Sequence, residues 1–412
     1  MNRTSHIVIL TGNHVCHNPR AFKEAESLTA EGYRVTWLGG WFDRSKIERD
    51  CRLLQGTQWN FIPVTEWPSS TVTRHWQRLR RKLAIEAHQR LGFESSLQLG
   101  YCVPELLKQA LAQSADLYIA HSEPALWVAT QLSNAGHRVA VDMEDWFSED
   151  LLPDRRRGRP VQLLKALEKT LLNNSAYATC TSHSMSKALA KAYACEPPVV
   201  IYNAFPWTER ERLDGQTKDR RNRSSSSIHW FSQTIGTGRG LEDLFAALRY
   251  LNAATEVHLR GQASPATLAW INSIVPADWR ERVFVHPLVH NDELLSRIAE
   301  HDIGVALEPT EPPNKNLTVS NKILQYLLGG VAVVGSDTAG HRELAALAPD
   351  ATLLYQSGNP YALATQLNVL LRDCEVLRKA KSAALVAAER SFCWERASES
   401  LVESVSNALK MR

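Results

Sequence analysis

The stretch DIGVALEPTEPPNKNLTVSNKILQYLLGGVAVVGS, residues 302–336, sets the pattern of the fold. Its first six and last six residues are apolar and rich in β-branched side chains, which is typical of buried strands. Between them, the apolar residues of 323–328 recur at helical spacing. Ser320 or Asn321 is a suitable N-cap for that helix, and the two glycines that follow it are suitable helix ends. The stretch therefore predicts a strand, a loop, a helix and a second strand.

The same alternation of apolar strands and amphipathic helices runs through most of the 412 residues. Alternation of this kind is typical of parallel sheets with helices on both faces. Two successive series predict an α/β protein of two Rossmann-like doubly wound parallel-sheet domains. The strands are expected at 6–10, 34–38, 61–64, 116–121, 138–142 and 177–181, and then at 228–232, 256–261, 282–287, 302–307, 331–336 and 352–355.

A polar segment, 208–227, separates the two series and ends in four serines. It is expected to be a linker or surface loop, with a phosphorylated or nucleic-acid-binding segment as the alternative. Residues 394–409 have helical periodicity and no strand follows them. The predicted divisions are an N-terminal domain at 1–205, a linker at 206–227, a C-terminal domain at 228–393 and a helix at 394–412 that crosses back toward the N-terminal domain.

Composition limits the classes of function. The net charge of +3 gives no general attraction to nucleic acid. The seven cysteines form no CxxC pair and no zinc-ligand spacing, which favours a reducing compartment. The apolar stretch near the N-terminus is too short for a signal peptide, and no apolar run approaches the ~20 residues that span a bilayer. The protein is expected in the cytoplasm, or peripherally on the inner face of the cell membrane.

Ligands of doubly wound sheets bind beyond the carboxyl ends of the strands, where the strand order reverses. With the common order 3-2-1-4-5-6, the strands at 228–232 and 302–307 are neighbours at that point. Their following loops, 233–244 and 308–322, are therefore expected to face one crevice.

The first of these loops, QTIGTGRGLEDL, combines closely spaced glycines with Arg239. Glycine lets the backbone turn tightly and approach a ligand, and successive N–H groups can form an anion nest. Arg239 adds a planar cation that suits phosphate oxygens. The alternative is a flexible turn with a solvated arginine.

Lys322 comes from the second loop and lies in the first turn of a helix, where the helix dipole disfavours a cation. A bound anion would neutralise both the lysine and the helix end. Two helix N-termini with Arg239 and Lys322 predict a diphosphate site. Gln325, one turn further, could bind a ribose or sugar hydroxyl. The alternative for Lys322 is a surface lysine whose stem covers apolar surface.

Several segments resemble the group 1, family-four glycosyltransferases of the GT-B fold, and together they cover nearly the whole chain. Their order and spacing make the resemblance specific. The segments are HNPRAFKEAESLTAEGYRVTWL (17–38), DLYIAHSEPALWVA (116–129), the stretch 167–189 before VVIYNAF (199–205), SQTIGTGRGLEDLFAAL (232–248) and NKILQYLLGGVAVVGSDTAGHREL (321–344).

The resemblance implies two domains facing a cleft, and a retaining hexosyltransferase that builds cell-surface polysaccharide. The partners implied are a nucleotide-diphosphate sugar and a glycan or polyprenyl-linked acceptor, with no cofactor, no metal and no nucleic acid. The catalytic residues are His121, which touches the donor sugar, and Arg239 and Lys322, which neutralise the leaving diphosphate. Donor contacts are assigned to Gln233, Gly236, Gly238, Arg239, Arg260, Ser320, Asn321, Lys322 and Gln325, and acceptor contacts to Gly12, His14, Arg20, Glu144 and Asp145.

One departure keeps alternatives open. The family has a glutamate where this chain has Gln325, and the partner glutamate falls on Leu317. A sugar-nucleotide epimerase of the same fold and a catalytically inactive nucleotide-sugar-binding scaffold are the alternative functions. The polar residues that could take over the missing contacts are Glu308, Glu311, Asn314 and Asn316.

Three further features have open interpretations. The acidic stretch 142–150 could hold a general base or acceptor contacts, a metal, or only solvated carboxylates. His14 or His17 could serve as the base of an inverting enzyme. The basic segment 74–91 has an apolar stripe of Trp76, Leu79, Leu83 and Ala87, bordered by basic residues. Together with the basic loop 154–160, it predicts either an acceptor that carries phosphate or an anionic membrane surface. The alternative is an ordinary surface helix whose apolar stripe packs on the core.

Overall fold

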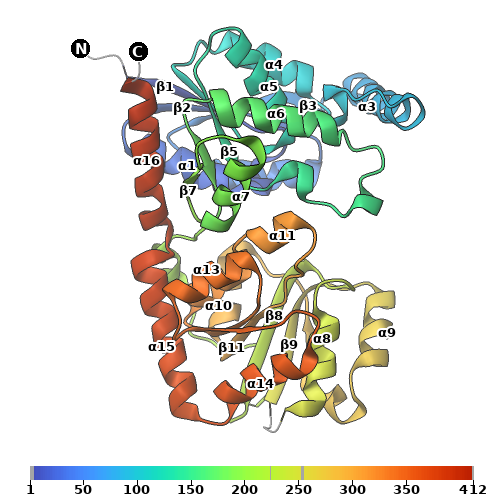
Figure 1. The fold of residues 1–412 in the computed structure, drawn as a ribbon, viewed down its shortest axis with the longest axis vertical. Coiled ribbons are helices and arrows are strands. Elements are labelled where there is room, and N and C mark those ends of the chain that lie inside the picture. Colours follow the sequence, from blue (N-terminus) through green and yellow to red (C-terminus); the bar gives the residue numbers. More distant parts are fainter. Residues whose placement is uncertain (1–3, 223, 252–254, 411–412) are drawn as a thin grey trace. The chain divides into compact units, whose positions relative to one another are not determined.

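The structure is a computed structural model that describes residues 4–222, 224–251 and 255–410. The first three residues of 1–205, residue 223 of the linker, residues 252–254 of the C-terminal domain and the last two of 394–412 lie outside the described residues. The chain divides into two compact units (Figure 1). Unit 1 comprises Met1–Ile201 with Ser398–Arg412, and unit 2 comprises Tyr202–Ala397.

Unit 1 is built on a seven-stranded, all-parallel sheet whose first six strands have the order 3-2-1-4-5-6. The six strands expected in this half are confirmed. The seventh, of two residues, carries too little periodic signal to be predicted. In spatial order the strands are β3 (Asn60–Glu66), β2 (Arg34–Trp41), β1 (His6–Leu10), β4 (Leu117–Ala120), β5 (Val139–Met143), β6 (Ala178–Cys180) and β7 (Val199–Val200).

The central strands β1, β4 and β5 are buried along their whole length, as expected where helices cover both faces of a parallel sheet. Helices connect the strands and bury one face each. They are α1 (Pro19–Ala30), α2 (Arg44–Leu53), α3 (Thr71–Leu91), α4 (Val103–Ala112), α5 (Ser122–Asn134), α6 (Val161–Asn174) and α7 (His183–Tyr193).

Unit 2 is built on a six-stranded parallel sheet with the predicted order 3-2-1-4-5-6. The first and fourth strands of this unit, β8 and β11, are hydrogen-bonded neighbours, with Ile303 opposite Ile228. The point of reversal therefore lies where the sequence placed it. In spatial order the strands are β10 (Val283–His286), β9 (Thr255–Gln262), β8 (Ser226–Thr234), β11 (Ile303–Ala306), β12 (Ala332–Ser336) and β13 (Thr352–Tyr355).

The helices of unit 2 form a separate core on each face of the sheet. One core contains α8 (Leu241–Ala247), α9 (Pro265–Ile274) and α14 (Pro360–Leu371). The other contains α10 (Asn291–Ala299), α12 (Asn321–Gly329), α13 (Ala339–Leu347) and α15 (Cys374–Ser391). The short helix α11 (Pro313–Leu317) precedes α12, and the last helix, α16 (Trp394–Lys410), has its residues from Ser398 onward in unit 1.

The polar segment after β7 is bound along unit 2 by charged side chains. Arg210 donates to the carbonyl of Leu328, and Asp214 accepts from the buried Arg297 at 2.6 Å. Its composition predicts a loop, but the partners of its charges lie far along the chain and could not be seen in the sequence. Within the described ranges, no helix is both long enough and apolar enough to cross a bilayer.

Candidate functional site

The loops after β8 and β11 meet closely at the carboxyl edge of the second sheet. Gly240 has a φ of 76°, and a Cβ built there would lie 2.4 Å from the Cβ and the carbonyl oxygen of Leu307. Only glycine permits this approach, because any side chain would overlap the chain at the end of β11. The glycine at position 240 is therefore explained by its contact with Leu307.

Arg239 folds back over the end of β8. Its guanidinium donates to the hydroxyls of Ser232 and Thr234, both at 3.0 Å. These partners are neutral, so the charge of the exposed arginine is not compensated by them. Gly238, just before it, has a φ of 71°, and its N–H donates to Glu242 at the start of α8.

Lys322 lies in the first turn of α12, as predicted, and its ammonium pairs with Glu308 at 2.5 Å. Ser320 caps the helix and donates to the same carboxylate at 3.1 Å. Burial raises the pKa of Glu308, but the Lys322 ammonium outweighs this effect and brings that pKa to about 2. The anion that makes the lysine tolerable at a helix N-terminus is therefore Glu308 in this structure.

Both cations lie against the same strand. The Lys322 ammonium is 5.8 Å from the centre of the Trp230 ring, and Arg239 is bonded to Ser232. Trp230 and Ser232 are two residues apart near the carboxyl end of β8, where the pairing of this strand with β9 becomes irregular. Arg239 and Lys322 thus converge on one edge.

The other predicted donor residues divide into two groups. Gln233 is exposed, Gly236 is half-buried and Gln325 lies half-buried on α12 one turn after Lys322, while Asn321 accepts from Asn203 at 3.1 Å. Arg260 is different. It is buried, and its guanidinium donates to the Pro287 carbonyl and to Asp219. Arg260 therefore ties the polar segment to the sheet, and a donor contact would require it to leave these partners.

The loop that was expected to supply substitute contacts is itself structured. Asn314 is buried, and the side-chain oxygen of Asn316 accepts from the N–H of Ala339 at the start of α13. Glu308 binds Lys322, so Glu311, which is exposed, is the member of this set left facing solvent.

In unit 1 the loops after β1 and β4 also meet. A Cβ on Gly12 would lie 2.4 Å from the ring of Pro124 in α5, and the Gly12 N–H donates to Ser122. The predicted acceptor residue Gly12 thus has a packing reason to be glycine. Ser122 follows His121 and has a φ of 70°, which fixes the start of α5.

His14 has both ring nitrogens engaged within unit 1. Its Nε2 accepts from the backbone N–H groups of Phe42 and Asp43, at 2.9 and 3.2 Å. A nitrogen that accepts from N–H groups carries no proton, so Nδ1 carries it and donates to Asp50 at 2.8 Å. His14 therefore positions the chain after β2, and neither nitrogen is free for an acceptor. His17 is exposed on the same loop.

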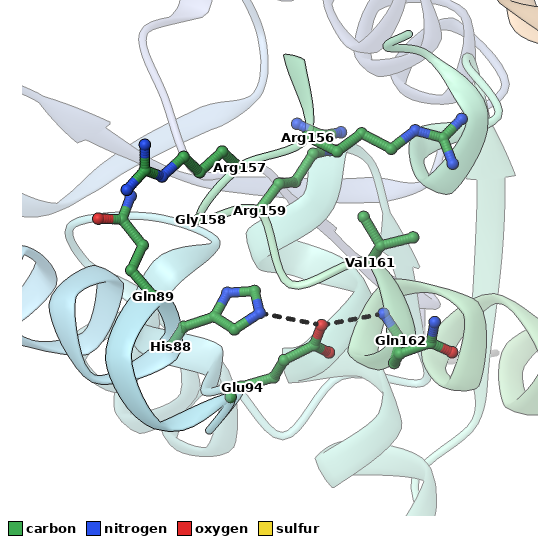
Figure 2. A pocket seen from close by; sticks show the side chains of 10 residues that line it. His88, Gln89, Glu94, Arg156, Arg157, Gly158, Arg159, Val161 and Gln162 are labelled. Atoms are coloured by element: carbon green, nitrogen blue, oxygen red, sulfur yellow. Dashed lines mark hydrogen bonds and ion pairs between the residues drawn. The ribbon is translucent and has the colours of Figure 1, made fainter. Parts of the chain in front are cut away.

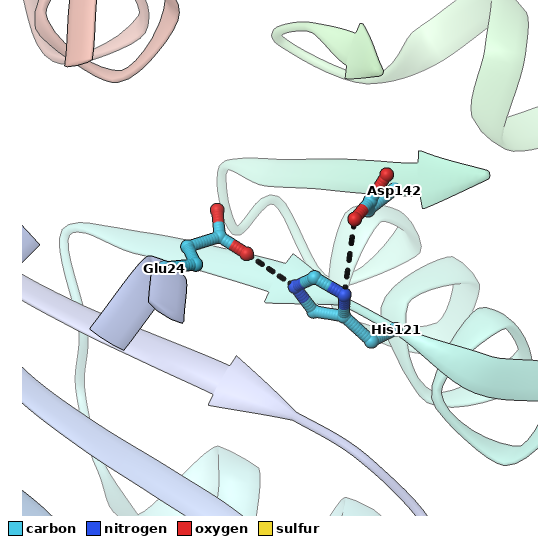
Figure 3. A group of neighbouring side chains, drawn as sticks. All are labelled: Glu24, His121 and Asp142. Atoms are coloured by element: carbon cyan, nitrogen blue, oxygen red, sulfur yellow. Dashed lines mark hydrogen bonds and ion pairs between the residues drawn. The ribbon is translucent and has the colours of Figure 1, made fainter. Parts of the chain in front are cut away.

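A buried charged cluster of Arg20, Glu24, His121 and Asp142 lies at the carboxyl edge of the first sheet. Figure 3 shows Glu24, His121 and Asp142. The His121 Nε2 is 2.5 Å from Glu24, and its Nδ1 is 3.2 Å from Asp142. Arg20 donates to both oxygens of Asp142, at 2.5 and 3.0 Å, and to the carbonyl of Ile201. The resemblance assigned Arg20 to the acceptor and His121 to the donor sugar. In the structure both side chains contact Asp142, and His121 also contacts Glu24.

The electrostatics of this buried cluster are balanced. Burial lowers the pKa of His121, but the two carboxylates outweigh this effect and raise it to about 10. His121 is therefore an imidazolium, and two cations face two carboxylates. The whole residue is buried, and its N–H donates to the carbonyl of Leu10, so the contact of His121 with a donor sugar stays a prediction.

Three members of the cluster have the composition of a metal site, because one atom each of Glu24, His121 and Asp142 lies within 4.8 Å of the others. An imidazolium has no lone pair to give a metal, and Arg20 adds a second positive charge beside Asp142. The residues therefore fit an ion network better than a cation site.

Glu144 has the electrostatics of an acid–base residue. It follows β5 and is half-buried, and burial raises its pKa to about 7, with Asp142 and Asp145 adding to the effect of burial against that of His121. A carboxyl group with a pKa near neutrality can both take and give a proton. Asp145, beside it, contributes negative charge to this edge.

The free energy of unfolding of the native protein is expected to fall as pH rises from about 4.5 to about 7, because Glu144 ionises. Glu144→Gln should not show this fall. The folded state holds the proton more tightly than the unfolded state, so ionisation costs stability above that window, on the order of 1–3 kcal/mol. Thermal melts at pH 4.5 and pH 8 measure the difference. Glu149→Gln is the matched control with the opposite sign, because Lys165 and Arg156 lower the pKa of Glu149 against the effect of its burial. Equal pH dependence in the native protein and Glu144→Gln would contradict the raised pKa.

The basic loop 154–160 borders a cavity of about 710 Å³ beside the end of α3 (Figure 2). Arg156 pairs with Glu149 at 2.6 Å and Arg159 with Glu123 at 2.5 Å. Glu94 caps α6 by accepting from the N–H groups of Gln162 and Leu163. Much of the positive charge that the sequence places here is therefore neutralised within unit 1.

No protein-family model matches the sequence, and no curated protein matches it. Solved structures do match. The sucrose-phosphate synthase of Thermosynechococcus elongatus has a TM-score of 0.68 at 14% identity, covering 98% of both chains. HepE of Anabaena, solved with UDP and glucose, has a TM-score of 0.67 at 17% identity, covering 98% of this chain and 99% of that chain. A UDP-forming α,α-trehalose-phosphate synthase of Burkholderia xenovorans has a TM-score of 0.68 at 13% identity, covering 98% and 99%. With two parallel sheets of order 3-2-1-4-5-6, this likeness shows that the protein has the GT-B fold of glycosyltransferases.

Proposed function

We propose that the protein is a glycosyltransferase that transfers a hexose from a nucleotide-diphosphate sugar to a glycan or lipid-linked acceptor in cell-surface polysaccharide biosynthesis. The convergence of Arg239 and Lys322 on the carboxyl end of β8 carries this proposal. Two cations at the point of strand reversal suit the two phosphates of such a donor. HepE, which has the same fold, was solved with UDP, so UDP-sugars are the first donors to test.

In the proposed reaction the bond from the anomeric carbon to the diphosphate breaks, and the cations stabilise the charge that develops on the leaving oxygen. Lys322 then shares its ammonium between Glu308 and the diphosphate. Gln325 binds a hydroxyl of the donor. The acceptor hydroxyl attacks the same face of a short-lived oxocarbenium ion and gives its proton to the leaving diphosphate oxygen, which retains the configuration, and no metal takes part.

The test begins with thermal stabilisation of the full chain by a panel of nucleotides and nucleotide sugars. Ligands that stabilise it are then incubated with and without candidate acceptors, and products are followed by mass spectrometry and NMR. Sugar transfer or slow donor hydrolysis supports a glycosyltransferase. Epimerisation of the donor without an acceptor supports the epimerase, and binding without turnover supports the inactive scaffold. Absence of stabilisation by any nucleoside diphosphate would reject all three.

We further propose that the protein works in the cytoplasm, on the inner face of the membrane. The support comes from α3, where Trp76, Leu79 and Leu83 are 59%, 49% and 58% exposed. These three side chains are exposed, and the buried residues of α3 are Gln77 and Ala84, on a different side of the helix. An exposed apolar stripe on a basic helix is suited to an anionic bilayer. A polyprenyl-linked acceptor would be met at the same surface.

The double variant Trp76→Ser/Leu83→Ser is expected to lose most of its binding to vesicles that contain phosphatidylglycerol, because the apolar contact is removed while the charge stays. Binding of the native protein should need anionic lipid and should fall with added salt. Vesicle sedimentation measures both. Leu347→Ser, at an exposed apolar position in unit 2, is the control. Native binding that is absent, or insensitive to salt, would contradict the proposal.

A further inference from the structure

A second cavity of unit 1 lies at the carboxyl edge of its sheet and includes Arg74 and Arg78 of the basic segment 74–91. Its volume is about 370 Å³. Phe42 comes directly after the last residue of β2, and Trp67 directly after the last residue of β3. The lining residues are Phe42, Asp43, Arg44, Trp67, Pro68, Arg74 and Arg78.

The aromatic wall of this cavity is held in place from behind. The Phe42 and Trp67 rings meet edge to face, with centroids 4.9 Å apart. The Trp67 indole donates, at 2.7 Å, to the side-chain oxygen of Gln77, a buried residue of α3. The Phe42 N–H donates to His14. Both rings are half-buried, so they combine a fixed position with surface left for a ligand.

The cavity carries an excess of positive charge, because three arginines and one carboxylate, that of Asp43, line it. Arg44, Arg74 and Arg78 form no ion pair and no side-chain hydrogen bond within the described part of the chain. Their neighbour Asp43 uses its carboxylate to cap α2, accepting from the N–H and hydroxyl of Ser45 at 2.9 and 2.6 Å. Three guanidinium groups around one cavity repel one another unless an anion joins them.

Other arginines of α3 show that this lack of partners is particular to the cavity. Arg80 pairs with Glu105 at 3.0 Å, and Arg81 donates to the Gln98 carbonyl while lying 4.8 Å from the Tyr101 ring centre. Arg74 and Arg78 are one turn apart and lie on the same side of the helix. The partnered arginines thus lie further along the helix than the two that line the cavity.

We propose that this cavity is an acceptor subsite for a sugar ring that carries a phosphate or a carboxylate group. The inference rests on the proposed function, since it names the acceptor of the same reaction. The aromatic rings offer apolar faces for the C–H face of a sugar, and the arginines offer paired N–H donors to a planar carboxylate or a phosphate. A neutral sugar would leave three cations without a partner, so the site selects acceptors by charge.

The test measures binding of glucose 6-phosphate, methyl glucuronide and methyl glucoside to the full chain by ligand-observed NMR, without vesicles. Both charged sugars are expected to bind at least about tenfold more tightly than the neutral one, with loss of that preference at high salt. The stronger of the two identifies phosphate or carboxylate. Arg74→Gln/Arg78→Gln should abolish the preference, while Lys82→Gln, one turn further along α3, should keep it.

The outcomes separate this inference from the proposed function. Equal binding of charged and neutral sugars, absence of saturable binding by either charged sugar, or an unchanged preference in Arg74→Gln/Arg78→Gln would each overturn the subsite. Inorganic phosphate that competes as well as glucose 6-phosphate would overturn its sugar specificity. Stabilisation by UDP should be the same in this double variant and in the native protein, because the donor site lies in unit 2. Failure of the native protein to bind UDP would reject the proposed function instead.

Discussion

Asp142→Asn is expected to lower the free energy of unfolding of unit 1 by about 3–5 kcal/mol. The carboxylate of Asp142 accepts from Arg20, faces the imidazolium of His121 and accepts from Thr179 at 2.8 Å. An amide keeps the shape but removes the negative charge, so two buried cations are left facing only Glu24. Uncompensated buried charge is among the largest costs that a single substitution can introduce.

Because the protein has two units, hydrogen exchange is a better measurement than one thermal midpoint. Amides of β4 and β5 should lose protection in Asp142→Asn, while those of β11 and β12 in unit 2 should keep theirs. Thr179→Val is the matched control, since it removes a neutral hydrogen bond to the same carboxylate and is expected to cost only about 1 kcal/mol. A cost in Asp142→Asn no larger than that of Thr179→Val would show that the cluster is not held by its charges.

The same cluster gives a pH dependence with two limits. The pKa of His121 is about 10 in the folded protein, above its ordinary value of 6.5, so its contribution is complete below about pH 6.5 and is lost as pH rises to about 10. The pKa of Asp142 is held far below its ordinary value, although burial raises it, because Arg20 and His121 favour the carboxylate. Its contribution is lost as pH falls below that ordinary value.

The fold was accessible from sequence because apolar periodicity reports burial directly. Strands such as β1 and β12 are buried throughout and mostly apolar, and every strand expected in the second half is present. The order 3-2-1-4-5-6 could be assumed because parallel crossovers are right-handed and connections are short. What the sequence could not supply was the position of the polar segment on unit 2, since Asp214 and Arg297 are far apart in the chain.

In the candidate sites too, the sequence reported features set by neighbouring residues and missed those set by tertiary contacts. Lys322 at a helix N-terminus is a local conflict, from which the sequence predicted a bound diphosphate; in the structure its ammonium pairs with Glu308, and the diphosphate stays a prediction. Arg20, His14 and Arg260 look from sequence like exposed polar groups on loops and strand ends. Their partners, Asp142, Asp50 and Asp219, are set by tertiary contacts, so the sequence assigned these residues to substrates. The Phe42–Trp67 cavity was missed because its residues come from three separate elements.

Arg239→Ala and Lys322→Ala are each expected to weaken binding of UDP by about 1–3 kcal/mol, or roughly tenfold to hundredfold in Kd. Each removes a charge-assisted hydrogen bond to a phosphate oxygen. Titration calorimetry with UDP and UMP measures the effect, which should be larger for UDP because the second phosphate lies between the two cations. Arg378→Ala, at an exposed ion pair on α15, is the control and should bind UDP like the native protein.

Lys322 needs a further comparison, because its removal also leaves the carboxylate of Glu308 without its cation. Glu308→Gln breaks the same ion pair from the other side, keeps the ammonium and removes the charge that competes with a diphosphate. If Lys322 binds the diphosphate, Glu308→Gln should bind UDP at least as tightly as the native protein, while Lys322→Ala binds it weakly. If Lys322 serves only to neutralise Glu308, both variants will lose stability and neither will lose affinity. That second result, together with an unchanged affinity for UDP in Arg239→Ala, would contradict the proposed diphosphate site at the end of β8.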